Sequence, residues 1–133
     1  MGHRLVAIDH VQLAMPAGGE DQATAFYQGI LGLERRPKPP VLAARGGCWF
    51  ANDDVVVHLG VESEFRAARK AHPALVVDGF DELCAALDSH GHPVTPDHDL
   101  PDVRRSYVDD PFGNRIELIQ GVSDGSARMV PGR

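Results

Sequence analysis

The chain has 133 residues, of which 43% are hydrophobic, and 13 basic against 19 acidic residues give it a formal charge of −6. A chain of this length can bury a proper core, and its composition lies outside the range of intrinsically disordered chains. The acidic balance argues against nucleic-acid binding. The sequence has no apolar run of the roughly 18 residues that a membrane span needs, and no secretory signal. We therefore expect a cytoplasmic protein without membrane contact.

The first half of the sequence predicts a strand, a helix and three further strands. Apolar and polar residues alternate over 7–14, which is typical of a strand. Apolar residues then recur at helical spacing over about 20–31, and Gly32 stands where a helix would end. Three short strands are expected after it, around residues 41–44, 47–51 and 54–60.

The second half repeats this order. Residues 71–77 have the pattern of a short strand, and apolar residues at helical spacing follow from Phe80 to Leu87. Asp78 is the expected N-cap of this helix and Gly91 its expected end. Three strands are expected near residues 93–95, 103–109 and 114–120, with a turn at 110–113 before the last.

The two halves indicate one domain of the α+β class over residues 1–120. Module one spans about 4–60, a charged linker 61–70, and module two about 71–120; residues 121–133 are expected to be a loose tail. Two βαβββ modules can form a curved mixed sheet with their helices outside. The concave face of that sheet would then be a cleft for a metal or a small ligand.

Four residues with metal-ligating side chains occupy equivalent positions in the two modules. His10 and His72 lie in the first strands, 62 positions apart, and His58 and Glu117 lie in the last strands, 59 positions apart. Their neighbours are aliphatic, so strand alternation places all four side chains on the concave face. A single strand histidine is more often merely solvated or hydrogen-bonded. Three imidazoles and a carboxylate at matching positions instead favour a divalent transition metal.

The chain also resembles the vicinal oxygen chelate superfamily, which contains glyoxalases, bleomycin-resistance proteins and extradiol dioxygenases. The resemblance covers about residues 4–120, and its most specific part is the ending D-P-x-G-x-x-I-E-L. In that family the metal ligands come from the first and last strands of each module, which implies the same four residues here. The matching segments are Ile8–Leu13, Phe26–Tyr27, Leu31–Leu33 and Asp110–Ile119.

The resemblance implies one divalent ion, which would be Fe, Mn, Ni or Zn, and a lyase, isomerase or dioxygenase reaction on a small oxygenated substrate. Glyoxalases typically have Glu at the position of His58, so this chain departs from their pattern. Extradiol dioxygenases and fosfomycin-modifying transferases use two His and one Glu, which match His10, His72 and Glu117. His58 would then be a fourth ligand or an acid/base, and His58 and Glu117 are the candidate catalytic residues.

Further candidates for substrate binding are Trp49, Phe50, Tyr107 and Arg104. Trp49 and Phe50 are consecutive in a strand, so one is expected in the core and the other in the cleft. Tyr107 lies in a late strand, where packing at the core or rim is the simpler interpretation. Arg104 is suited to a carboxylate or phosphate, although a solvated charge is the simpler interpretation here too.

An alternative function is that of a binding module of the bleomycin-resistance type, which sequesters a ligand without metal chemistry. Such proteins generally lack the four ligands, and the charge of −6 would suit a cationic ligand. In either case the partner is a small molecule, and the resemblance implies a homodimer. Because modules in this family pair within one chain or between two, the sequence leaves open whether one or two subunits form the site.

Overall fold

The computed structural model describes residues 2–121, so most of the predicted tail, residues 122–133, lies outside the described part. Module one contains a four-stranded sheet in the order β1-β4-β3-β2, in which β1 runs parallel to β4 and the other neighbours are antiparallel. Its elements are β1 (Val11–Met15), α1 (Glu20–Tyr27), β2 (Glu34–Arg36), α2 (Pro40–Ala43), β3 (Cys48–Ala51) and β4 (Val56–Val61).

Module two has the same topology, with the order β5-β8-β7-β6 and β5 parallel to β8. Residues 62–73 connect the modules without a helix or strand. The predicted α+β class and the repeated βαβββ order are therefore confirmed, with four strands in each of two sheets. The elements are β5 (Ala74–Val77), α3 (Phe80–Ser89), β6 (Thr95–Asp97), β7 (Arg105–Asp109) and β8 (Arg115–Gln120).

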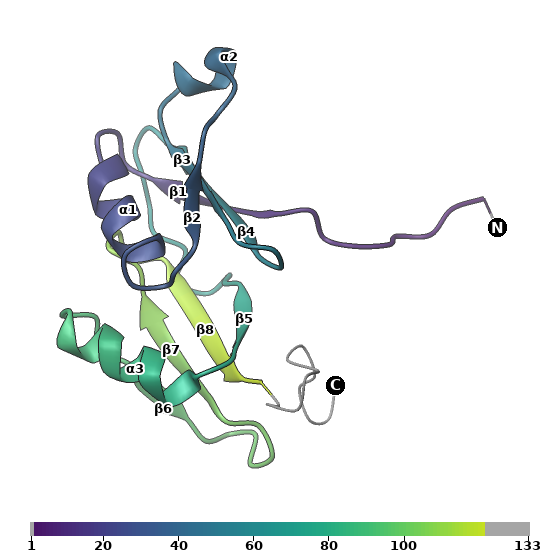
Figure 1. Ribbon diagram of the computed structural model, residues 1–133, viewed down its shortest axis with the longest axis vertical. Coiled ribbons are helices and arrows are strands. Elements are labelled where there is room, and N and C mark those ends of the chain that lie inside the picture. Colours follow the sequence, from purple (N-terminus) through teal and green to yellow (C-terminus); the bar gives the residue numbers. More distant parts are fainter. Residues whose placement is uncertain (1, 122–133) are drawn as a thin grey trace.

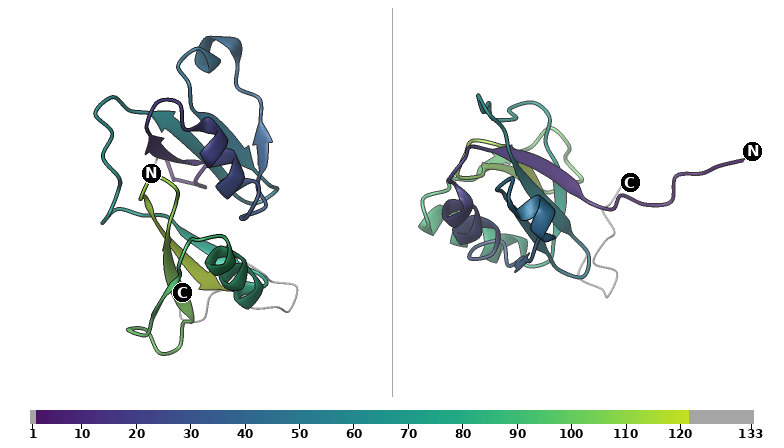
Figure 2. Two further views of the ribbon diagram at one scale, coloured as in Figure 1. Left: turned by 90° about the vertical axis from the view of Figure 1, so that its left-hand side faces the viewer. Right: turned by 90° about the horizontal axis from the view of Figure 1, so that it is seen from above.

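The helices α1 and α3 lie on one side of the molecule, and both sheets lie on the other side (Figures 1 and 2). The strands turn alternate side chains toward these helices, where they are buried. Phe26 and Phe50 of module one and Leu87 and Leu118 of module two belong to one cluster of buried hydrophobic residues. None of the helices within residues 2–121 is long and apolar enough to cross a membrane.

One prediction for module one is wrong. The strand expected at 41–44 is the short helix α2, and the second strand of the sheet lies earlier, at β2. Pro40 occupies the first helical turn, where its fixed φ suits a helix, and the Pro39 carbonyl accepts the N–H groups of Leu42 and Ala43. All three residues of β2 are charged and exposed, so hydrophobic alternation gave no sign of this edge strand.

Smaller differences concern where elements begin and end. β1 begins at Val11 rather than at residue 7, and α1 ends at Tyr27, after which a turn leads to Gly32 at φ +80°. The N-cap of α3 is Gly79, at φ +77°, and not Asp78. These shifts shorten the elements but leave their order unchanged.

A buried polar cluster joins the two modules. The Tyr27 hydroxyl donates to Asp110 Oδ2 at 2.7 Å, and Asn114 Nδ2 donates to the same oxygen at 2.9 Å. Asn114 Nδ2 also donates to the Ala14 carbonyl of β1 at 2.8 Å, and Asn114 Oδ1 accepts the Ala68 N–H at 3.0 Å. The segment predicted as a turn at 110–113 is thus also part of the junction that fixes one module against the other. We call Tyr27, Asp110 and Asn114 the clasp.

The clasp makes stability depend on pH above about pH 10. Burial and the adjacent Asp110 carboxylate raise the pKa of Tyr27 well above its usual range. The folded state therefore holds the phenolic proton more tightly than the unfolded state, whose Tyr pKa is about 10. The contribution of Tyr27 to the free energy of unfolding is therefore present in full below pH 10 and is lost as the pH rises further. Denaturant unfolding over this pH range should show a shallower loss of stability for Tyr27→Phe than for the wild type.

Candidate metal centre

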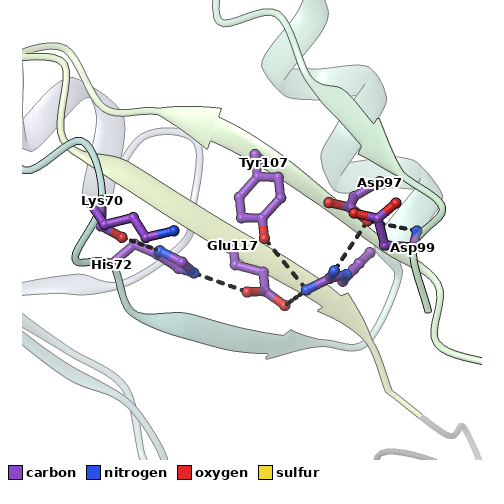
Figure 3. A network of polar contacts seen from close by, with 7 residues as sticks. Lys70, His72, Asp97, Asp99, Tyr107 and Glu117 are labelled. Carbon is purple, nitrogen blue, oxygen red and sulfur yellow. Dashed lines mark hydrogen bonds and ion pairs between the residues drawn. The ribbon is translucent and has the colours of Figure 1, made fainter.

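His72 and Glu117 form the first half of the candidate site. His72 lies just before β5, and Glu117 is a buried residue of β8, the strand that pairs with β5. His72 Nδ1 is 2.8 Å from the Lys70 carbonyl oxygen, and His72 Nε2 is 3.0 Å from Glu117 Oε1 (Figure 3). Because a carbonyl oxygen only accepts, Nδ1 carries a proton, and the second nitrogen faces the carboxylate.

This geometry brings a nitrogen and an oxygen donor to one point. When His72 is neutral, Nε2 and Glu117 Oε1 are both acceptors, and a proton or a cation between them stabilises their approach. The Nδ1–H bond to a backbone carbonyl is also the arrangement that orients histidines that bind metals. His72 and Glu117 are therefore suited to bind a cation together.

Arg105 on β7 holds the other oxygen of Glu117. Its guanidinium lies 3.2 Å from Glu117 Oε2 and 3.1 Å from Asp97 Oδ1, and its side chain is 13% exposed. The Arg105 side chain also contacts the Tyr107 hydroxyl at 3.4 Å, while its Nε is buried without a hydrogen-bond partner among the described residues. The two oxygens of Glu117 thus have separate partners, since Oε2 contacts Arg105 and Oε1 contacts His72.

Three stacked rings form the second half of the candidate site, in module one. His58 is in the middle of β4, with Trp49 of β3 beside it in register. The His58 ring lies 4.2 Å from the Trp49 ring and 4.0 Å from the His10 ring, with interplanar angles of 7° and 21°. His10 precedes β1, and its Nδ1 is 2.8 Å from Asp9 Oδ2. Partial burial, and next the neighbouring His10, lower the pKa of His58, which favours its neutral form.

The structure therefore brings the four predicted ligands together in two pairs, one in each module, and not at one point. Among residues 2–121, no group of three or more His, Cys, Asp and Glu side chains is placed to hold a metal ion. The expectation that all four converge is not met within one chain.

The donor set nevertheless fits a divalent transition ion. His72 and Glu117 already face one point, as described above. The His10 and His58 rings are stacked 4.0 Å apart in nearly parallel planes, so one ion cannot lie in the plane of both rings at a bond length of about 2.1 Å, and His10 would have to turn to share it. The His10 side chain is 37% exposed and contacts the adjacent Asp9 and the His58 ring, so a turn would break few interactions.

Of the four predicted substrate-binding residues, two lie with the candidate ligands and two lie elsewhere. Trp49 and Tyr107 lie with the candidate ligands, since Trp49 stacks on His58 and the Tyr107 ring is 5.5 Å from the His72 ring. Phe50 is completely buried and stacks on Tyr27 in the core, so it is the core residue of the Trp49-Phe50 pair.

Arg104 lies on the helix side, away from the candidate ligands. Its guanidinium is 2.6 Å from Asp81 of α3 and 5.1 Å from the centre of the Phe80 ring. The hydrogen bond from Arg104 lowers the pKa of Asp81. Sequence reasoning chose Arg104 for the site rather than the adjacent Arg105. Strand alternation could have identified Arg105, because Arg105 and Tyr107 alternate with the buried residues of β7.

The fold and the two pairs of candidate ligands indicate a class of protein, that of two repeated βαβββ modules with His and Glu side chains gathered beside their sheets. The family model of the Glyoxalase/Bleomycin resistance protein/Dioxygenase superfamily matches residues 7–118, and the chain belongs to this superfamily. Members of the superfamily typically use a divalent metal. A search of curated proteins found no match to the sequence.

Several solved structures are similar to the chain. A protein of the glyoxalase family from Bacillus anthracis is 48% identical, with a TM-score of 0.85 over 90% of this chain and 98% of its own. The fosfomycin resistance protein of Listeria monocytogenes is 17% identical, with a TM-score of 0.70 over 90% of this chain and 97% of its own. Lactoylglutathione lyase of Agrobacterium tumefaciens is 24% identical, with a TM-score of 0.65 over 90% and 96%. Because the last two are less than 25% identical to the chain, they show only that the fold is similar.

Proposed function

We propose that this protein is a metal-dependent enzyme, a lyase, isomerase or dioxygenase that acts on a small substrate with two neighbouring oxygen atoms. His10 and His58 of one subunit, with His72 and Glu117 of a second subunit, would hold one divalent ion, which is Fe, Mn, Ni or Zn. The observation that supports this most is the His72–Glu117 pair, in which a backbone carbonyl orients the imidazole and Arg105 orients the carboxylate.

The clasp is the reason for assigning the site to a homodimer. To bring the two ligand pairs together within one chain, the modules would have to close onto each other. That movement would break the bonds from Tyr27 to Asp110 and from Asn114 to the Ala14 carbonyl, which is costly because buried or half-buried polar groups would lose their partners. A second subunit can supply the missing pair while both clasps stay intact.

The bound ion would supply a positive charge that stabilises an enediolate or oxyanion on two adjacent substrate oxygens. The surrounding residues supply position and shape. Arg105 holds Glu117 in place, Trp49 offers a flat apolar surface, and the Tyr107 hydroxyl lies close to Arg105. His58, in its neutral form, can ligate or accept a proton from the substrate.

Metal analysis of the full chain, purified without chelators and then loaded separately with Fe, Mn, Ni or Zn, tests the proposal. We expect about one tightly bound ion per subunit in the wild type, and removal of that ion by EDTA. His72→Ala should retain no ion above background, whereas His98→Ala, which removes an exposed loop histidine, should bind as the wild type does. If the wild type holds no more of any of these metals than His72→Ala, the proposal is wrong.

A second candidate is a ligand-binding protein without metal chemistry, and the ring stack of Trp49, His58 and His10 is the observation in its favour. Flat rings of this kind bind aromatic or cationic ligands by stacking and cation–π contacts. This candidate predicts that such a ligand binds equally well with and without EDTA. The metal-dependent enzyme predicts that EDTA abolishes turnover.

A further inference from the structure

A small pocket opens on the sheet of module one, beside the stacked pair of His10 and His58. It has a volume of about 200 Å³, and its lining includes Gln12 of β1, Trp49 of β3 and Gly60 of β4. Gln12 lies opposite His58 in the pairing of β1 with β4, and the Trp49 ring stacks on the His58 ring. The pocket therefore adjoins the candidate ligands of module one.

The segment that connects β2 to β3 brings two cations to this pocket. Lys38 and Arg45, which lie before and after α2, both line it. Lys38 is half-buried, and its Nζ donates to the Gly46 carbonyl, which holds the ammonium in place and leaves two of its three N–H groups for a ligand. No acidic residue is among those of residues 2–121 that line the pocket. The pocket therefore has a net positive lining in a chain whose formal charge is −6.

Three further side chains with N–H donors in this lining have no hydrogen-bond or ion-pair partner within the described part of the chain. They are the Arg45 guanidinium, the Gln12 amide and the Trp49 indole. The Gln12 amide lies over Gly60, since a Cβ at residue 60 would come 2.7 Å from Gln12 Nε2. An anionic oxygen accepts hydrogen bonds from all of these groups, and such charge-assisted bonds are the strong ones. Arg and Lys are also the residues that bind carboxylates and phosphates in proteins.

We propose that this pocket, the anion pocket, binds an oxyanion group of the substrate, which is a carboxylate or a phosphate. The substrate would then carry this group in addition to its two neighbouring oxygen atoms. A volume of about 200 Å³ is below the range of about 300–1,000 Å³ that is usual for a whole drug-sized ligand, so the pocket suits one end of a substrate. The proposal rests on the proposed function only for the role of the anion pocket in substrate binding. Its main test therefore uses metal-free protein.

Trp49 is the single tryptophan of the sequence, so its fluorescence reports directly on the anion pocket. Metal-free protein, dialysed to remove EDTA, is titrated with sodium phosphate and separately with sodium acetate, with sodium chloride keeping the ionic strength constant. We expect a saturable change with at least one of these anions, and the lower Kd identifies the preferred group. Arg45→Gln and Lys38→Met should each raise that Kd by at least about tenfold, because each removes a charge-assisted hydrogen bond.

Arg35→Gln is the matched control, because it makes the same change of charge on β2, where the Arg35 side chain contacts Thr24 of α1 on the helix side. It should leave the Kd within about twofold of the wild-type value. Thermal unfolding of each variant shows whether it is folded. A wild type that gives no saturable change with either anion, or an equal rise in Kd for Arg35→Gln and Arg45→Gln, would overturn the proposal. A protein that binds metal but neither anion would leave the proposed function standing.

Metal-loaded protein tests whether the anion pocket and the candidate metal centre bind the same substrate. Lactate, malate and 2-hydroxyglutarate all offer two neighbouring oxygens to the ion, but only the last two carry a second carboxylate. At least one of these diacids should bind at least about tenfold more tightly than lactate, and Arg45→Gln should remove this preference. If neither diacid is preferred, or if the preference survives in Arg45→Gln, the role in substrate binding is wrong. If the metal-free protein binds an anion but no metal binds, the anion pocket stands and the proposed function fails.

Discussion

Replacement of Glu117 by Gln is expected to weaken metal binding by at least about 100-fold in a competition titration against a chelator. Glu117 is the one anionic side chain among the four candidate ligands, and a neutral amide is a much poorer ligand for a divalent ion. The substitution keeps the shape of the side chain, so the change in affinity reports the charge. In the wild type one carboxylate oxygen faces Arg105 and the other faces His72. An amide has only one oxygen, so it can no longer offer an acceptor oxygen to both partners.

The same substitution should lower the free energy of unfolding of the metal-free protein, by about 1–3 kcal/mol, because it removes one of two carboxylates from a mostly buried guanidinium. Asp97→Asn is the control, since it removes the other carboxylate of Arg105 without touching a candidate ligand. It should cost a similar amount of stability but leave metal affinity close to that of the wild type. Equal metal affinity for Glu117→Gln and Asp97→Asn would contradict the assignment of Glu117 as a ligand.

The local order of the fold could be predicted because each module repeats the same periodic signals. Period-2 alternation in 47–51 and 54–60 predicted β3 and β4, and the spacing from Phe80 to Leu87 predicted α3. β2 could not be found in this way, because its residues are charged and exposed on both faces. Its place in the sheet comes from pairing with β3, which is a tertiary contact.

The candidate site, like the fold, could be predicted from the sequence only in part. Matching positions in the two modules predicted which side chains are equivalent, and strand pairing places His72 close to Glu117. Equivalence does not say which chain the other pair comes from, because a repeat in the sequence contains no information on how modules associate. The role of Arg105 depends on a contact twelve residues along the chain. Parity alone would have placed Arg105 on the correct face without naming its partner.

The sequence motif at the end of module two has a role that local reasoning found only in part. Asp110 Oδ1 accepts the N–H groups of Phe112 and Asn114, and Gly113 has φ +91°, so the turn predicted at 110–113 is confirmed. The bond of Asn114 to the Ala14 carbonyl, however, spans 100 residues of sequence. Such a contact follows from the packing of the modules and cannot be inferred from turn chemistry.

Asn114→Ala is expected to lower the free energy of unfolding by about 3 kcal/mol, because it leaves the half-buried Ala14 carbonyl and Ala68 N–H, and the buried Asp110 carboxylate, without their side-chain partner. For a chain of this size the midpoint of thermal unfolding should fall on the order of 10 °C. Calorimetry measures the fall directly. Metal affinity per folded dimer should change much less than in Glu117→Gln, because Asn114 contacts none of the four candidate ligands.

Asn52→Ala is the matched control for the clasp. The Asn52 side chain also bonds two backbone groups, because its Oδ1 accepts the N–H groups of Asp54 and Val55, but it lies in an exposed turn within module one. Water can replace its bonds, so the loss should stay below about 1 kcal/mol. If Asn52→Ala and Asn114→Ala destabilise the protein equally, the clasp does not hold the modules together. The modules of one chain would then be free to close, which would remove the argument for a site between two subunits.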